Sequence, residues 1–459
     1  MPKHLLGSAH FIEIEGEAAK PDFSNLCNKL LIGHPVTRKG AATDRFLTIP
    51  TKRHAVAIAP NRSGKGTGLI VPNLLNYGGS VLVVDPKGEN AYITAPQRRR
   101  MGQKTIILDP WGEVNRRYGQ KSGELEEVAT FNPFSILNPA SPDYADDLAY
   151  LADALIISQS KTDPFFDDSA RDLVAGLMAF CVEKFGVHAN LAQVRALLRT
   201  PAENIAKIAK EAGEEFAARD FESMAAHKLA AFMVAGKTVE NILMTARAQL
   251  QFLDSAPLLN NLEKSSFSFD DLTERETTIY LVLPVDKLDT KGRWLRLMVS
   301  IAIRQIARNE RILKSPVLFM LDEFGTIGRL NAIARAFGLM SGLQMCVFAF
   351  LQDLNQLKRD YPDDWETFIS NTEALAAFSV MDNFSAKYIS EMCGTATVIN
   401  EDNRGGVSHY KRELLTPDEV RRHACALLLT REGPFKYLAR PYYEDPYFRS
   451  VARKNPFYD

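Results

Sequence analysis

A series of short, almost continuously apolar runs constrains what this chain can fold into. The runs lie between residues 54 and 382 and read HAVAIA, SVLVVD, TIILD, TTIYLVLP, PVLFMLDEF, MCVFAFLQ and ALAAFSVMD. Segments with helical periodicity separate many of them. Apolar strands that are joined through helices are typical of a parallel sheet covered on both faces. We therefore predict an α/β fold with a mainly parallel sheet.

The strand pattern stops between about residues 143 and 270, where only helical spacing occurs. One helical face is formed, for example, by Leu148, Leu151, Ala152 and Leu155. The 459 residues leave room for about three domains at roughly 150 residues each. We predict an all-α domain at 143–270, inserted into an α/β domain formed by 1–142 and 271–459, the second part ending in a C-terminal tail.

Charge and cysteine content exclude several classes of protein. With 55 basic and 56 acidic side chains, the net charge is −1, which argues against a surface that binds polyanions as a whole. The five cysteines are far apart and form no C-x-x-C, so we expect neither disulfides nor a zinc ribbon, and a reducing compartment fits best. No apolar run reaches the roughly 20 residues that a membrane-spanning helix needs, and no signal peptide is evident.

The first apolar run leads into a glycine-rich loop, Ala59-Pro60-Asn61-Arg62-Ser63-Gly64-Lys65-Gly66-Thr67-Gly68. The loop is close to the phosphate-binding pattern G-x-x-x-x-G-K-[ST], with Ala59 in place of the first glycine and Gly66 in place of the hydroxyl residue that ligates Mg²⁺. Backbone N–H groups and a helix N-terminus attract phosphate, and Lys65 can reach the β- and γ-phosphates. Thr67 has the nearest hydroxyl that could take the place of that residue at the metal. We expect 61–67 to bind nucleotide; a simple glycine turn is the alternative.

A second motif lies at the end of PVLFMLDEF, where an apolar strand stops at Asp322 and Glu323. Carboxylates in this position lie in the crevice where open α/β sheets bind ligands. We expect Asp322 to hold Mg²⁺ through water and Glu323 to orient or deprotonate the attacking water. Acidic residues that merely end a strand are the alternative, but this motif and Lys65 together favour ATP hydrolysis.

The next run, MCVFAFLQ, ends in Gln352, whose amide is placed to contact the γ-phosphate or the water. A polar residue that only leaves the strand is an equal alternative. Asp85, Lys87 and Glu89 follow another strand, and their pattern assigns them no role beyond a capped turn between strand and helix.

Other chemistries lack support in this sequence. The eight histidines show no metal spacing, and neither H-E-x-x-H nor G-x-S-x-G occurs. Basic clusters occur at 98–100, 116–117 and 421–422. We interpret all three clusters as solvated surface, with phosphate contact as the alternative.

Together, these motifs resemble the type IV coupling proteins, the TraG-type ATPases of conjugation and type IV secretion. The resemblance rests on APNRSGKGTGLIVPNLLNYGGSVLVVDPKGEN, LDEFGTIGRL, and LQDLNQL followed by FSVMDNFSAKYIS, and it runs from about Leu6 to Tyr447. It implies a RecA-like P-loop domain with Gly64, Lys65 and Gly66 in the nucleotide loop. Asp322 with Glu323 matches the family's second nucleotide motif, Gln352 matches its strand-end glutamine, and the helical insertion lies where the family carries its all-alpha domain.

The resemblance also implies a function. Such proteins are ATP- and Mg²⁺-dependent motors that act as homo-hexameric rings at the cytoplasmic face of the bacterial inner membrane. Their partners are relaxase–DNA complexes or effector proteins, together with the secretion-channel ATPases and inner-membrane components, and contact with DNA is implied.

This sequence departs from the family pattern in two respects. LLGSAHF near the start is similar to the segment that follows the family's membrane anchor, yet no anchor is found, so we expect either a removed anchor or a member that reaches the membrane through partners. A ring ATPase commonly lends an arginine to its neighbour. Arg329 and Arg335 follow the acidic motif, but neither matches a motif position.

Two other functions compete with an ATP-driven coupling protein. One is a nucleotide-gated receptor with little turnover that recognises substrate through its all-α domain. The other is a double-stranded DNA pump related to FtsK or HerA, against which the near-neutral charge and the large helical insertion weigh.

Overall fold

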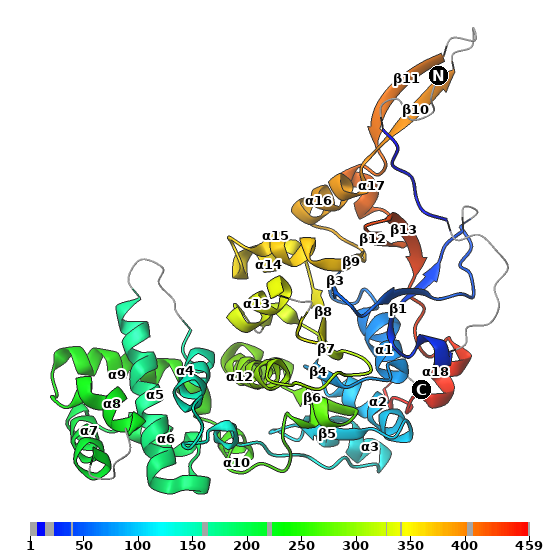
Figure 1. Cartoon of the computed structure of the whole chain (residues 1–459). Coiled ribbons are helices and arrows are strands. Elements are labelled where there is room, and N and C mark those ends of the chain that lie inside the picture. The colour runs from blue at the N-terminus through cyan, green and yellow to red at the C-terminus, as the bar shows by residue number, and fades with distance from the viewer. Residues whose placement is uncertain are drawn as a thin grey trace. The chain divides into compact units, whose positions relative to one another are not determined.

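A computed structural model describes residues 7–13, 23–37, 40–157, 164–217, 223–326, 328–339, 342–401 and 407–457. These residues form two compact units, whose elements Figure 1 labels. Unit 1 comprises Met1–Thr105, Leu272–Tyr280 and Asn309–Asp459, and unit 2 comprises Ile106–Asp271 and Leu281–Arg308.

A large sheet forms the centre of unit 1. Its strands are β1 (Lys29–Pro35), β2 (Leu47–Pro50), β3 (His54–Ile58), β4 (Val81–Asp85), β7 (Val317–Leu321), β8 (Met345–Leu351), β9 (Thr372–Ala377), β12 (Ala426–Thr430) and β13 (Gly433–Leu438). Their order is β2-β1-β13-β12-β9-β3-β8-β7-β4, and it continues with β6 (Thr277–Val282) and β5 (Lys104–Leu108), which begin in unit 1. β9, β3, β8, β7 and β4 are parallel neighbours, whereas β12, β13, β1 and β2 pair antiparallel.

The predicted α/β fold is confirmed, and every predicted apolar run contains a strand. All residues of β3, β4, β7 and β8 are buried, because helices cover both faces of a parallel sheet. Figure 1 shows α1 (Val71–Asn76) and α2 (Glu89–Arg100) on one face, and α13 (Asn331–Leu339), α14 (Leu354–Asp360) and α15 (Trp365–Ser370) on the other. The antiparallel strands were not predicted: β1, β2 and β13 mix polar residues with apolar ones, and the short apolar run of β12, ALLLT, was overlooked.

A two-stranded ribbon, β10 (Thr395–Glu401) with β11 (Val407–Glu413), extends away from the sheet of unit 1 (Figure 1). Near the N-terminus, Ser8 forms an antiparallel bridge with Ala396 of β10. The remaining helices of unit 1 are α16 (Asn383–Cys393), α17 (Pro417–Arg421) and α18 (Pro446–Val451), the last of which lies in the C-terminal tail.

The prediction that the first basic cluster is solvated surface was wrong for Arg98, which is fully buried. Its guanidinium donates hydrogen bonds to Thr278 Oγ1 at 2.8 Å, to the carbonyls of Leu74 at 3.1 Å and Gly79 at 2.8 Å, and to the carbonyl of Tyr77. Burial lowers the pKa of Arg98 to about 10. The carbonyls at the end of α1 satisfy the buried cation, because they carry the negative end of the helix dipole.

Unit 2 is helical. Its helices are α3 (Gln120–Ser122), α4 (Tyr144–Leu155), α5 (Phe165–Phe185), α6 (Leu191–Leu198), α7 (Ala202–Ala217), α8 (Met224–Leu229), α9 (Lys237–Gln249), α10 (Ala256–Asn261) and α12 (Leu288–Ala307); α11 (Asp271–Glu274) lies at its boundary with unit 1. The predicted apolar face of α4 is buried. Across the described ranges, no helix combines the length and the hydropathy that crossing a membrane requires.

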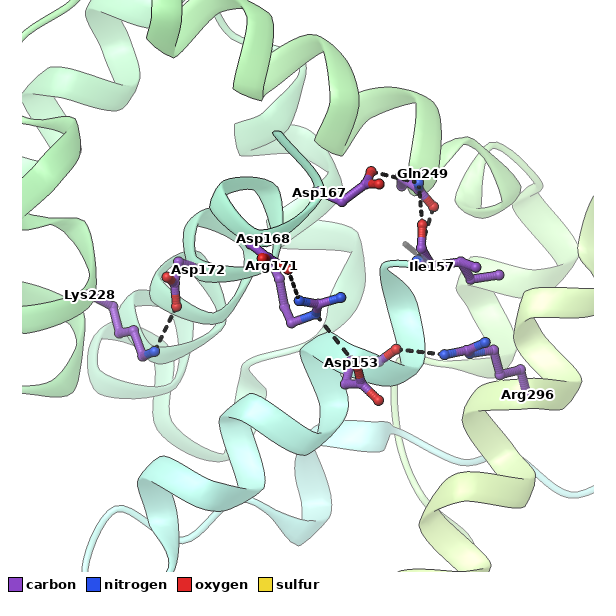
Figure 2. Close-up of polar contacts among 9 residues, drawn as sticks. All are labelled: Asp153, Ile157, Asp167, Asp168, Arg171, Asp172, Lys228, Gln249 and Arg296. Carbon is purple, nitrogen blue, oxygen red and sulfur yellow. Dashed lines mark hydrogen bonds and ion pairs between the residues drawn. The ribbon is translucent and has the colours of Figure 1, made fainter. Parts of the chain in front are cut away.

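Polar contacts tie the helices of unit 2 together (Figure 2). Arg296 of α12 donates to the carbonyls of Asp153 at 2.9 Å and Ala154 at 3.0 Å, which belong to the last turn of α4. The Gln249 side chain at the end of α9 donates to the carbonyl of Ile157 at 3.0 Å and accepts from its N–H at 3.3 Å. These side chains satisfy backbone groups at and just beyond a helix end that would otherwise lack partners.

Candidate nucleotide site

The carboxyl ends of four parallel strands bring the predicted site residues to one edge of the sheet. Lys65 lies in the loop after β3, Asp322 and Glu323 follow β7, and Gln352 follows β8. β4 ends at Asp85. Because these strands run in the same direction, the four strand ends meet in the crevice where such sheets bind ligands.

Lys65, Asp322 and Glu323 form a compact group that we call the site cluster. Lys65 Nζ lies 3.0 Å from Asp322 Oδ1 and 2.8 Å from Glu323 Oε1, and the three side chains are 12%, 17% and 19% exposed. Burial by itself would lower the pKa of Lys65, but the two carboxylates outweigh burial and hold it above its ordinary value. The cluster therefore contains one cation between two carboxylates.

Gln352 joins the site cluster through Glu323. Its Nε2 donates to Glu323 Oε2 at 3.1 Å, so the amide and Lys65 hold opposite oxygens of one carboxylate. Gln356 holds the backbone of Gln352 in turn, because its Oε1 accepts from the Gln352 N–H at 3.0 Å. The sequence analysis did not identify Gln356; its position four residues after a strand-end glutamine, on the first turn of α14, was the available signal.

The loop and the acidic turn both contain left-handed backbone. Arg62 has φ 64°, Gly64 has φ 88° and Glu323 has φ 62°. The carbonyl of Glu323 accepts hydrogen bonds from the N–H and the hydroxyl of Thr326, at 2.9 and 2.7 Å, which stabilises the acidic turn. Non-glycine residues in this conformation cost of order 1 kcal/mol or more and concentrate at functional sites.

The residues present fit a triphosphate with Mg²⁺. A Cβ placed on Gly64 or Gly66 would meet no described heavy atom within 4 Å, so the loop leaves open space beside its backbone. The buried Oδ1 of Asp322 is within ion-pair distance of Lys65, yet no aligned hydrogen bond reaches it from the part of the chain that the structure describes. An ammonium, two carboxylates and an amide belong to the same site, and they supply a cationic donor for phosphate oxygens and carboxylate oxygens for a hard cation.

The remaining loop residues take different positions. Asn61 and Arg62 are exposed, and Ser63 Oγ is buried without a hydrogen-bond partner among the described residues. Thr67, the predicted metal ligand, donates from Oγ1 to the Gly64 carbonyl at 3.3 Å, so its hydroxyl faces the loop.

Neither arginine considered for a role in a neighbouring subunit belongs to the site cluster. Arg329 pairs with Asp364 at 3.5 Å. Arg335 is exposed on α13.

Asp85, to which the sequence pattern assigned only a capped turn, accepts from the N–H of Ala91 at 2.8 Å and so caps the start of α2. Burial raises its pKa to about 7, and the charges of Glu89 and Asp322 add to this rise. Asp85 is therefore a buried carboxyl near the site cluster.

Known proteins resemble this chain over most of its length. A family model described as type IV secretory system conjugative DNA transfer matches residues 3–458. The protein VirD4 of Rhizobium radiobacter is 27% identical over 449 residues, which cover 93% of this chain and 60% of the relative. The conjugal transfer protein TraG of Escherichia coli is 26% identical over 404 residues, covering 80% of this chain and 61% of the relative. The chain thus spans about three fifths of these relatives.

Solved structures share the fold. The unbound bacterial conjugative coupling protein TrwBdeltaN70 superposes with a TM-score of 0.66 at 15% identity, covering 89% of this chain and 93% of that one. TrwB in complex with ADP and Mg²⁺ has a TM-score of 0.64 at 15% identity, covering 90% and 94%. The resemblance to the type IV coupling proteins is confirmed. Because the family model matches nearly the whole length, this chain belongs to the type IV secretory system conjugative DNA transfer family.

Proposed function

We propose that this chain is the ATP-hydrolysing part of a type IV coupling protein. The observation that carries the proposal is the site cluster itself. Lys65 and Glu323 are 258 positions apart in sequence, and their side chains make a 2.8 Å ion pair beside an open glycine loop. Taken separately, the glycine loop could be a simple turn and the acidic pair could simply end a strand. Neither alternative requires that the two side chains form an ion pair.

Each side chain has a separate role in the proposal. Lys65 exchanges its carboxylate partners for oxygens of the β- and γ-phosphates, and Glu323, once released, orients the attacking water and accepts its proton. Gln352 contacts the γ-phosphate or that water. Through its hydrogen bond with Gln356, it couples the presence of the γ-phosphate to the position of α14. Mg²⁺, held by Asp322 through water and by Thr67, would offset the phosphate charge.

The solved relatives support a purine nucleotide in this position. TrwB is described in complex with ADP and Mg²⁺, with a non-hydrolysable ATP analogue and with a GTP analogue. By the same reasoning we assign the phosphate loop to 61–67 of this chain.

The wider role is also part of the proposal. We assign 1–142 and 271–459 to a nucleotide-binding domain and 143–270 to an all-α domain. The assembled protein would be a homo-hexamer at the cytoplasmic face of the inner membrane. It would deliver relaxase–DNA complexes or effector proteins to the secretion channel, in contact with the channel ATPases and inner-membrane components.

The test is Glu323→Gln, measured as ATP turnover with Mg²⁺ and as ADP affinity, both with and without single-stranded DNA. We expect turnover to fall about 100-fold or more, because a positioned general base contributes roughly 10²–10⁴ in rate, while ADP affinity changes little. Glu373→Gln, in a partly exposed acid on β9 that pairs with Arg53 at 3.8 Å, is the matched control.

Unchanged turnover in Glu323→Gln, with nucleotide still bound, would show that another group is the base. Nucleotide binding with negligible turnover in the unaltered chain would instead favour the receptor function.

A further inference from the structure

The segment that follows β13, Ala439–Tyr443, lies against the nucleotide loop. The N–H of Tyr442 donates to the carbonyl of Thr67 at 2.9 Å. A Cβ on Gly68 would come within 2.8 Å of the Ala439 Cβ, so only glycine allows this approach. The segment is therefore held at the first helical turn after Lys65.

Sheet topology places this segment on a definite side of the loop. β9 is parallel to β3, β12 is antiparallel to β9, and β13 is antiparallel to β12, so β13 runs in the same direction as β3. The segment and the glycine loop therefore leave the sheet at the same edge. The acidic turn and Gln352 lie on the opposite side of β3, after β7 and β8.

This arrangement sets the direction of a bound nucleotide. The γ-phosphate belongs beside Glu323, since that side carries the site cluster. Because the phosphates form a short linear chain over the loop, the nucleoside must leave toward the other side. Thr67, Gly68 and the segment that these residues hold lie on that side.

The segment ends in a half-exposed aromatic side chain. Tyr443 is 47% exposed, and its ring packs edge-on against the buried ring of Tyr442, with 5.4 Å between the centroids. Tyr442 is fixed by its backbone bond to the loop, so it holds the neighbouring ring in position. A positioned ring that is open on one side suits stacking against a planar base.

We propose that Ala439–Tyr443 is the nucleoside wall of the site, with Tyr443 as the residue on which the base stacks. This inference rests on the proposed nucleotide function and deepens it. A ring contacts the π-face of a base and does not read its hydrogen-bonding edge. The site therefore accepts adenine and guanine nucleotides alike.

The test compares ligands with and without a nucleoside. ATP, GTP and inorganic tripolyphosphate are titrated into the full chain and into Tyr443→Ala and Tyr443→Phe variants, with Mg²⁺ present, by calorimetry. We expect Tyr443→Ala to weaken ATP and GTP binding to the same extent, about 5- to 100-fold, which is the scale of base stacking measured by alanine substitution. Tripolyphosphate affinity stays unchanged, and Tyr443→Phe retains the affinity of the unaltered chain for all three ligands.

Tyr410→Ala is the matched control, because Tyr410 is 48% exposed on the ribbon strand β11 and contacts neither the loop nor the site cluster. Equal losses for ATP and tripolyphosphate in Tyr443→Ala would overturn the inference, as would no loss for either. The proposed function fails in a different way: the unaltered chain would then bind none of the ligands, or Lys65→Ala would leave both ATP and tripolyphosphate affinity unchanged.

Discussion

Two charge clusters in this molecule each place one charged group between two groups of opposite charge. The clusters differ in the backbone and the hydrogen bonds around them. In the site cluster of unit 1, one cation lies between two carboxylates. In the helix cluster of unit 2, which we define as Asp147 with Arg304 and Arg308, one carboxylate lies between two guanidiniums. Asp147 accepts from Arg304 Nε at 2.6 Å and from Arg308 Nη1 at 3.1 Å, and its side chain is only 3% exposed.

The difference lies in the supporting backbone and in the remaining hydrogen bonds. Asp147 and Arg304 are on the regular helices α4 and α12, and both carboxylate oxygens of Asp147 have donors. The site cluster is built on a loop and a turn with left-handed residues, and Asp322 Oδ1 has no aligned donor among the residues described. Charge pairing alone therefore does not mark a functional site. We expect incomplete pairing on strained backbone to mark one, because it leaves groups ready to take other partners.

The largest effect should come from removing the cation of the site cluster. Lys65→Ala loses charge-assisted hydrogen bonds to phosphate, so we expect nucleotide affinity to fall on the order of 100-fold or more while the circular dichroism stays native. Lys184→Ala, which removes a surface lysine paired with Glu211, serves as the control. If Lys65→Ala bound nucleotide as tightly as the unaltered chain, the site cluster would not differ from the helix cluster in its role in nucleotide binding.

Breaking the helix cluster should change stability instead of binding. Asp147→Ala leaves Arg304 without its buried partner, whereas the more exposed Arg308 keeps its ion pair with Asp143 at 3.1 Å, so we expect a loss of about 2 kcal/mol of unfolding free energy. Urea denaturation measures this loss, and nucleotide affinity measured below the transition should be unaffected. Asp168→Ala, in an exposed pair with Arg171, should cost at most about 1 kcal/mol. A loss of nucleotide binding in folded Asp147→Ala would show that the helix cluster is also functional.

Two carboxyl groups, Asp85 in unit 1 and Asp254 in unit 2, should contribute to stability with opposite pH dependence. Burial raises the pKa of Asp85 to about 7, so folded Asp85 binds more protons than unfolded Asp85, and its contribution to stability declines as the pH rises from about 4 to 7. In unit 2, hydrogen bonds from Arg195 lower the pKa of Asp254 to about 2, so its contribution is present above about 4 and is lost as the pH falls toward 2.

Thermal melts across this pH range test the contrast. Asp85→Asn keeps an acceptor for Ala91 and should gain stability over the unaltered chain toward pH 7, on the order of 1–2 kcal/mol. Asp254→Asn should lose stability relative to the unaltered chain above pH 4, and this difference should shrink in acid. Parallel pH profiles for the two variants would contradict the assigned shifts.

The smallest effect concerns backbone strain in the loop. Arg62 has φ 64° and an exposed side chain, and glycine adopts this conformation without steric cost. We expect Arg62→Gly to raise the unfolding free energy by up to about 1 kcal/mol, measured by urea denaturation. Ala145→Gly, in the first turn of the regular helix α4, should lower stability by a similar amount. Destabilisation in both variants would show that Arg62 is not strained.

Much of the parallel sheet could be predicted because its strands are mostly buried on both faces and are therefore largely apolar. Lys65, Asp322 and Gln352 were identified because each stands where an apolar run ends, and their assigned roles stay predictions. Arg98 was misplaced because arginine is usually exposed, and only the acceptors around it, from the end of α1, from Gly79 and from Thr278, explain its burial. The antiparallel strands and the contact of Tyr442 with Thr67 depend on pairings between distant segments that leave no local pattern.

The amino-acid sequence by itself determined the short-range features: which runs become strands, where the glycine loop turns, and where the carboxylates stand on their strands. Hydrophobic periodicity and the conformational freedom of glycine act over a few residues, so their effects can be predicted from one segment of the sequence. Only the tertiary structure decided which segments meet. The order of strands around β3 brings Glu323 to one side of Lys65 and the segment after β13 to the other, because pairing and direction within a sheet depend on surfaces that exist only once the distant strands have packed together.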